Sequence, residues 1–280
     1  MENKDLHQSW SEAKEIFRKR KERSEPEFPT GLSFLDNATD GLSKGELWII
    51  AGKSGRGKTS LAVQIANSFA ENPEHSILFL SLEMKGWELT TRMFCEMNGV
   101  NYTDLKKGFF PVDFEEKDKC FKNYISTIDF EIYEHGYNFN EIVKILTQSY
   151  KDKKPDVIFI DFLQLIEWRK SGDERTALDE YIRKLKELAN TQNIGIVVVS
   201  QLRRLPSGVN YERPPDIIDL KGSGLIEQAA DKIILIYGKE EDDKIRYYIN
   251  LAKNRQGETI TEEVIFQGWF YRFKEIEKRY

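Results

Sequence analysis

Short apolar runs alternate with amphipathic helical patterns through most of the chain. The apolar runs, rich in Val, Ile, Leu and Phe, lie at 45–52, 76–83, 156–161, 194–201 and 232–237. Strands buried on both faces have this composition, which is typical of a parallel sheet between two layers of helices. The helical patterns lie at 58–71, 86–98, 113–126, 138–151 and 176–191. We therefore predict an α/β fold with a mostly parallel sheet flanked by helices.

The pattern changes near the C-terminus. The segments IRYYINLAKN, TEEVIF and WFYRF are separated only by turn residues. Strands joined so closely pair antiparallel, because parallel strands need long crossover connections. We expect them to form antiparallel strands at one edge of the sheet.

The N-terminal segment also differs from the rest. The stretch SWSEAKEIFRKRKER predicts a helix over 8–20, with a narrow apolar stripe made by Trp10, Ala13, Ile16 and Phe17. The basic block RKRKER that follows is either a solvated helix face or a contact to phosphate or to a partner. Two prolines and a glycine in SEPEFPTG then indicate a linker. The predicted division is an N-terminal helix and linker, 1–27, and one large domain, 28–280.

Composition narrows the class of protein. With 40% apolar and 32% charged residues among 280, the chain resembles an ordinary globular protein. No apolar run approaches the ~20 residues of a membrane span, and the start lacks a signal-peptide pattern, so we expect a cytoplasmic protein without a membrane partner. Cys95 and Cys120 lack CxxC spacing and indicate free thiols. The net charge of −5 argues against a surface broadly adapted to nucleic acid, but it permits a local basic channel.

A phosphate-binding loop follows the first apolar run. The sequence GKSGRGKT at 52–59 fits the pattern G-x-x-x-x-G-K-[ST], between a predicted strand and a predicted helix. Its backbone N–H groups would face phosphate oxygens at the positive end of the helix. Lys58 would reach the β- and γ-phosphates of ATP, and Thr59 would bind Mg²⁺. The candidate nucleotide-binding residues are Gly52, Ser54, Gly55, Arg56, Gly57, Lys58, Thr59 and Ser60.

Three polar residues end other apolar strands. Asp161 closes VIFID, where a carboxylate can hold the Mg²⁺ of a P-loop enzyme, although such an Asp can also cap a helix. Glu83 follows LFLSL and is a candidate base for the attacking water, or else an ordinary loop glutamate. Gln201 ends VVVSQ and is a candidate γ-phosphate donor, or else a satisfied polar strand end.

Lys253 and Arg255, two residues apart in LAKNRQGET, would point the same way on a strand. They are either charges that protect a sheet edge or cations that complete a phosphate site. A site built from Lys58, Thr59, Asp161 and Glu83 includes no second cation for the charge that grows on the transferred phosphate, which favours an arginine finger.

Taken together, these motifs resemble the RecA-type ATPase domain of DnaB-family replicative helicases. The resemblance covers roughly 28–273 and keeps the family's order and spacing. It rests on FPTGLSFLDNATDGLSKGEL, the P-loop, LSLEM…TRMFCEMNGV, VIFIDFLQLI, VVVSQLRR, DLKGSGLIEQAAD and AKNRQG.

The resemblance implies a ring, usually of six subunits, that uses ATP and Mg²⁺ to move 5′–3′ on single-stranded DNA. ATP sites would lie between subunits, with Glu83 as the catalytic base, Gln201 as the γ-phosphate sensor and the Lys253–Arg255 pair acting in the neighbour's site. The N-terminal helix would pack on the adjacent subunit. A primase or a helicase loader is the expected protein partner.

The resemblance also places a DNA-binding loop at 219–224. The candidate DNA contacts are Lys221, Gly222, Ser223, Gly224, Arg203 and Arg204. Lys221 stands where the family commonly has Arg, and Gly222 where it commonly has Glu; main-chain contacts to phosphate would survive both changes. The neighbouring loop 203–213 adds Arg203, Arg204 and Arg213 nearby, and it is either a further contact to DNA or an ordinary solvated loop.

One departure from the family, and motifs shared across the RecA superfamily, keep alternatives open. DnaB helicases carry a helical N-terminal domain that has almost no counterpart here, so we expect a compact stand-alone member or an isolated ATPase region. A recombinase-like or KaiC-like ATPase of the RecA superfamily would share the P-loop, SLEM and SQL elements. A non-catalytic partner that uses nucleotide as an assembly switch is disfavoured, because Glu83, Asp161 and Arg255 are all present.

Overall fold

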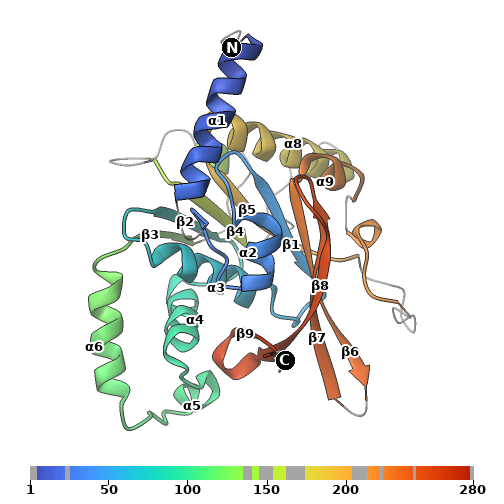
Figure 1. The fold of residues 1–280 in the computed structure, drawn as a ribbon. Helices are drawn as coiled ribbons and strands as arrows, with labels where there is room; N and C mark the ends of the chain where they lie inside the picture. Colours follow the sequence, from blue (N-terminus) through green and yellow to red (C-terminus); the bar gives the residue numbers. More distant parts are fainter. Residues whose placement is uncertain are drawn as a thin grey trace.

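The computed structural model is built around one large sheet (Figure 1). It describes residues 5–22, 26–134, 141–144, 154–161, 174–203, 213–220, 223–241 and 244–277. Within these residues the sheet has nine strands in the order β3-β2-β4-β5-β1-β6-β7-β8-β9. The strands are β1 (Leu47–Gly52), β2 (Ser76–Ser81), β3 (Asp129–Glu134), β4 (Val157–Asp161), β5 (Gly195–Gln201), β6 (Lys232–Glu241), β7 (Lys244–Asn254), β8 (Ile260–Gln267) and β9 (Arg272–Glu275).

The sheet is parallel from β3 to β6 and antiparallel from β6 to β9. The central strands β1, β2 and β4 are buried along their whole length, which explains their unbroken apolar runs. The predicted fold class, including the antiparallel C-terminal edge, is confirmed.

Helices cover both faces of the sheet. The helices whose bounds the structure gives are α1 (Leu6–Glu22), α2 (Ser33–Thr39), α3 (Lys58–Ala70), α4 (Gly86–Asn98), α5 (Tyr102–Lys106), α6 (Phe114–Ile125), α8 (Glu174–Gln192) and α9 (Ser223–Ala229), and α1 is not among those that cover the sheet. One core packs α3 and α4 against side chains such as Ile50 and Phe79. The other packs α8 and α9 against side chains such as Ile49 and Val198. Alternate strand residues thus face opposite helical layers.

The differences from the predicted elements are local. β3 was not predicted, because its residues are only partly buried at the sheet edge. The short helices α2, α5 and α9 were also missed. Of the helix predicted at 138–151, only 141–144 is described, and it is helical. The predicted strand WFYRF begins with a 3-10 turn, Gly268–Phe270, before β9.

The N-terminal helix α1 extends away from the body of the molecule (Figure 1). It buries none of its residues, and Trp10, Ile16 and Phe17 are each more than half exposed, at 57%, 52% and 54%. Near its end, Arg20 forms an ion pair of 3.2 Å with Asp40. The predicted apolar stripe therefore has no packing partner within the described part of the chain. No helix among the described residues combines the length and apolarity needed to cross a bilayer.

Candidate active site

The P-loop curls tightly between β1 and α3 because glycines allow two close approaches. A Cβ on Gly52 would lie 2.7 Å from the carbonyl oxygen of Ile236 on β6. Gly57 has a φ of +86°, and a Cβ there would lie 2.7 Å from the ring of Phe273. Both positions therefore require glycine. Gly55 also has a positive φ, of +74°, but open space around it.

Lys58 begins α3 and is almost fully buried, with 8% of its surface exposed. Its ammonium donates to the carbonyl oxygen of Lys53, at 3.0 Å. Burial lowers the pKa of Lys58, while the negative charges of Asp161 and Glu83 oppose this shift. An anion placed beside this ammonium would be strongly favoured, since the charge is poorly hydrated where it lies.

The other residues of the loop differ in exposure. Ser60 is buried, Thr59 is half-buried and Ser54 is exposed. The guanidinium of Arg56 lies over the ring of Tyr247, at 5.9 Å from its centre. Arg56 thus connects the P-loop to an aromatic side chain on β7.

Asp161 is the least compensated charge of the site. It is 1% exposed at the end of β4, and both carboxylate oxygens lack a well-formed hydrogen bond among the described residues. Burial raises its pKa to about 6; the hydroxyl of Thr59 lowers the pKa, and the charge of Glu83 raises it. Buried polar atoms without partners are rare in folded proteins. A carboxylate and a hydroxyl brought together in this way fit a bound Mg²⁺, a hard cation that prefers oxygen ligands.

The strand ends bring the remaining candidates to the same edge of the sheet. β2 lies beside β4, with Ser81 opposite Asp161, so the exposed Glu83 follows directly beyond that edge. β5 lies beside β1, with the half-buried Gln201 opposite Gly52. The structure therefore brings together the P-loop, Asp161, Glu83 and Gln201, at the carboxyl ends of parallel strands where ligands of α/β sheets bind.

The strand that ends in Gln201 leads on to the candidate DNA-binding segment. Leu202 forms a bridge with Leu220, and Nε of Arg203 donates to the carbonyl oxygen of Leu220 at 3.0 Å. The predicted contacts Arg204, Lys221 and Gly222 lie outside the described residues. Ser223 and Gly224 begin the helix α9 rather than lying in a loop, and Gly224 is exposed.

Lys253 and Arg255 lie at the opposite end of the strands from the P-loop, near the amino ends of β1 and β6. Pairing of β6 with β7 sets Asn254 opposite Lys232, at the level of Trp48 near the start of β1. Arg255 is therefore displaced from the P-loop by about five residues of strand, or roughly 16 Å. The structure does not bring these two residues into their own chain's nucleotide site.

Both cations turn toward the segment that joins α9 to β6. The ammonium of Lys253 donates to the carbonyl oxygens of Glu227 and Ala230, the latter at 2.6 Å, and burial lowers its pKa. Arg255 lies 3.1 Å from Asp231. Lys253 thus binds carbonyls at the end of α9, where a cation is favoured.

The sequence model of one protein family, the DnaB-like helicase C-terminal domain, matches residues 28–275 of this chain. The chain belongs to this family.

Curated relatives of this DnaB-like domain are named replicative helicases. A probable plasmid replicative DNA helicase of Chlamydia muridarum is 33% identical over 255 residues, which are 89% of this chain and 55% of the relative. The replicative DNA helicase DnaB of Helicobacter pylori is 34% identical over 227 residues, or 78% of this chain and 46% of the relative. The chain therefore spans about half the length of the curated relatives it matches.

Solved structures share the fold. One of them, an isolated ATPase domain, superposes with a TM-score of 0.85 at 25% identity, over 99% of this chain and 100% of the other. A DnaB-like replicative helicase, studied with primase, superposes with a TM-score of 0.80 at 26% identity, over 89% of this chain and 63% of the other.

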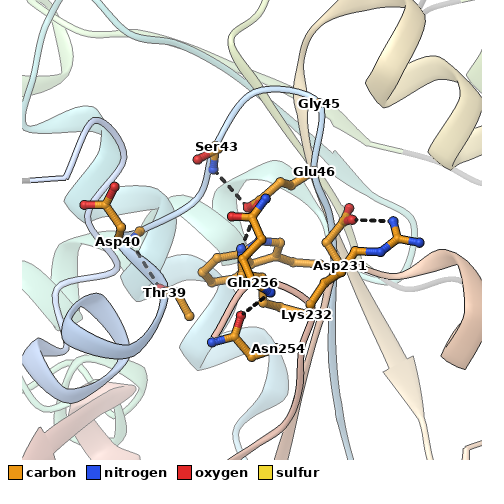
Figure 2. A network of polar contacts seen from close by, with 12 residues as sticks. Thr39, Asp40, Ser43, Gly45, Glu46, Asp231, Lys232, Asn254 and Gln256 are labelled. Carbon is orange, nitrogen blue, oxygen red and sulfur yellow. Dashed lines mark hydrogen bonds and ion pairs between the residues drawn. The ribbon is translucent and has the colours of Figure 1, made fainter. Parts of the chain in front are cut away.

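Sequence analysis of this DnaB-like domain missed a polar network at the amino ends of β1 and β6 (Figure 2). Lys232 is 1% exposed and pairs with Glu46, and Asp231 pairs with Lys186 at 2.6 Å. The available signal was a pair of charged residues, Asp231 and Lys232, directly before an apolar strand. Such residues are seldom buried unless they are paired.

Proposed function

We propose that this chain is the ATP-hydrolysing motor of a ring-forming helicase that moves 5′–3′ along single-stranded DNA. The placement of Arg255 carries the proposal. It lies at the opposite end of the strands from the P-loop, farther than its side chain extends, so any nucleotide that it contacts would have to lie in the site of a neighbouring copy. Membership of the DnaB-like family and the names of the relatives support the same conclusion.

In this proposal the phosphates of ATP bind the main chain of residues 52–59 and the ammonium of Lys58. Thr59 and Asp161 would hold Mg²⁺, which supplies positive charge beside the β- and γ-phosphate oxygens. Glu83 would accept the proton of the attacking water, and Gln201 would donate to the γ-phosphate. The support is their common place at the carboxyl ends of the strands and the buried carboxylate of Asp161, which lacks a well-formed hydrogen bond among the described residues.

The adjacent subunit would complete the site by placing its Arg255 beside the γ-phosphate. Lys253 would serve as a second cation only by exchanging its bonds to α9 for a bond to phosphate. The remaining role of the pair is to stabilise charge that grows during transfer.

The proposed nucleic-acid substrate is single-stranded DNA. Arg203, Arg204, Lys221, Gly222, Ser223 and Gly224 would bind its phosphates through side chains and main-chain N–H groups. The bridge between Leu202 and Leu220 supports coupling, because it joins the strand of Gln201 to this segment. A change at the γ-phosphate could thereby move the DNA contacts.

The proposed assembly is a homohexamer that works in the cytoplasm. We assign 1–27 to a helix and linker that pack on the adjacent subunit, and 28–280 to the ATPase domain. The unburied stripe of α1 supports this assignment, since exposed apolar side chains grouped on one helix face are expected where a partner packs. A primase or a helicase loader would be a further protein partner.

An unwinding assay on a forked duplex tests the function. Forks that carry only a 5′ tail or only a 3′ tail are compared in the presence of ATP and Mg²⁺, with the Lys58→Ala variant as the inactive control. We expect strand separation that depends on the 5′ tail, together with ATP hydrolysis that rises with single-stranded DNA. DNA-stimulated hydrolysis without unwinding on either fork would instead indicate a recombinase-like ATPase.

A further inference from the structure

Asp231 holds Arg255 at two points. The backbone N–H of Arg255 donates to the carbonyl oxygen of Asp231 at 2.9 Å, and Nη1 of Arg255 lies 3.1 Å from Oδ1 of Asp231. The carboxylate side chain is 6% exposed, whereas the arginine side chain is 55% exposed. A buried group therefore fixes a cation that remains accessible from outside.

The other carboxylate oxygen anchors Asp231 to the body of the domain. Oδ2 accepts the N–H of Leu47 at 2.8 Å and the ammonium of Lys186 at 2.6 Å. Lys186 also donates to the carbonyl oxygen of Gly45, at 2.8 Å. Asp231 thus connects Arg255 to the first residue of β1, the strand that leads to the P-loop, within the network of Figure 2.

The charge state of Asp231 suits this role. Burial raises its pKa, but the hydrogen bonds from Lys186, Leu47 and Arg255 outweigh burial and hold the pKa below its ordinary value. The group is therefore a carboxylate at neutral pH. Its two oxygens have different partners: Oδ2 is bound inside the protein and Oδ1 is bound to Arg255.

A purely structural role would not require the contact with Arg255. Lys186 already neutralises the buried carboxylate, and an ion pair to a half-exposed arginine adds little to stability. Orientation is the larger consequence. A guanidinium held at one nitrogen keeps its rigid fork in one direction, with donors remaining for phosphate.

We propose that Asp231 is the positioning residue of the arginine finger. This inference rests on the proposed function, in which Arg255 reaches the γ-phosphate of the neighbouring subunit. Loss of such a finger lowers the rate by ~10³–10⁵-fold, whereas misplacement of a catalytic group by about 1 Å lowers it by about 10²-fold. Removing the charge of Asp231 should therefore produce the smaller loss.

The test measures steady-state hydrolysis and nucleotide affinity of the assembled full chain with single-stranded DNA. Asp231→Asn keeps the shape and should lower kcat about 10²-fold without changing the affinity for nucleotide. Glu258→Gln is the matched control, because it removes an exposed negative charge three residues after Arg255 in the chain, and it should leave kcat unchanged. If the Asn variant does not assemble, Asp231→Glu is measured in its place; it keeps the charge but moves the carboxylate by one methylene, and it should also lower kcat without changing the affinity for nucleotide.

A second comparison separates positioning from stability. Lys186→Met removes the internal partner of Asp231 and should lower the melting temperature while keeping most of kcat. In an Arg255→Ala background, Asp231→Asn should cause no further loss, because the two residues act as one unit. An equal kcat loss in Lys186→Met, or additive losses in the double variant, would overturn the inference.

The two proposals can fail separately. If Arg255→Ala hydrolyses ATP normally, the proposed function is wrong, and the inference falls with it. If Arg255→Ala is inactive but Asp231→Asn retains full kcat, only the positioning role of Asp231 is overturned.

Discussion

At the scale of single residues, the nucleotide site is built around charges that folding leaves poorly compensated. Asp161 is buried without a well-formed hydrogen bond to any described residue, and Lys58 is buried with a neutral carbonyl as its acceptor. Ligand binding would recover the free energy that such groups cost the ligand-free protein, because the proposed ligands ATP and Mg²⁺ would supply the missing opposite charges. The ligand-free protein is therefore expected to be less stable than variants in which one of these charged residues is replaced by a neutral one.

The pKa of Asp161 determines how the stability of the ligand-free protein should change with pH. Its folded-state value of about 6 lies above the ordinary 3.8, so the folded protein binds an extra proton between these two values. Stability of the ligand-free protein therefore falls as pH rises through that interval, and the charged form is the unfavourable one above it. Asp161→Asn should raise the free energy of unfolding at about pH 7 by on the order of 1–2 kcal/mol.

Thermal melts of the ligand-free wild type and of Asp161→Asn check this prediction. The gain should shrink toward zero below about pH 4, where the wild-type carboxyl becomes protonated in both states. The same variant should lose Mg²⁺-dependent hydrolysis. An Asn variant that is less stable at neutral pH and fully active would show that Asp161 is a structural residue.

The placement of site residues could be predicted from the sequence where a local motif determines the backbone geometry. The glycines of the P-loop and the strand-end Asp161 are examples, since local spacing sets where they lie. The partner of Arg255 was not readable. Asp231 is near Arg255 only because β7 runs antiparallel beside β6. The spacing of residues within one segment does not determine the register between two strands.

At the scale of elements, long periodic segments were predicted and short or half-buried ones were missed. β1, β2 and β4 have buried positions throughout, so their apolar runs are unambiguous. β3 lies at the sheet edge with intermediate burial, and α9 is too short to show a helical period. α1 was predicted because it is long and amphipathic, although its stripe packs on nothing described in its own chain.

The exposed stripe of α1 makes a prediction about assembly. Replacing Ile16 and Phe17 by Ser should weaken subunit association, because burying each of these side chains contributes ~1.5–3 kcal/mol. The melting temperature of dilute, unassembled protein should not change, since neither residue is buried within the chain. Lys14→Ser, on the same helix, is the control. Sedimentation velocity with ATP and Mg²⁺ measures the effect, and unchanged association of the Ser variant would remove α1 from the interface.

At the scale of the whole molecule, the sheet separates the two groups of residues that the proposed reaction requires. The P-loop, Glu83 and Asp161 lie at the carboxyl ends of the parallel strands, and Arg255 lies at the opposite end of the strands, beside the amino end of β6. In the proposed mechanism a single copy would carry both groups without being able to join them. Assembly would then be a requirement of the chemistry, and each interface would combine the P-loop of one subunit with Arg255 of the next.

Mixing two inactive variants tests this claim most directly. Arg255→Ala subunits keep the P-loop half, and Glu83→Gln subunits keep the arginine half. Each variant alone should bind nucleotide and hydrolyse it at least ~10³-fold more slowly than the wild type. Mixed together, they should regain hydrolysis, because some interfaces then pair an intact Glu83 with an intact Arg255. No recovery in mixtures that do assemble would contradict the shared site and return Arg255 to the role of an edge charge.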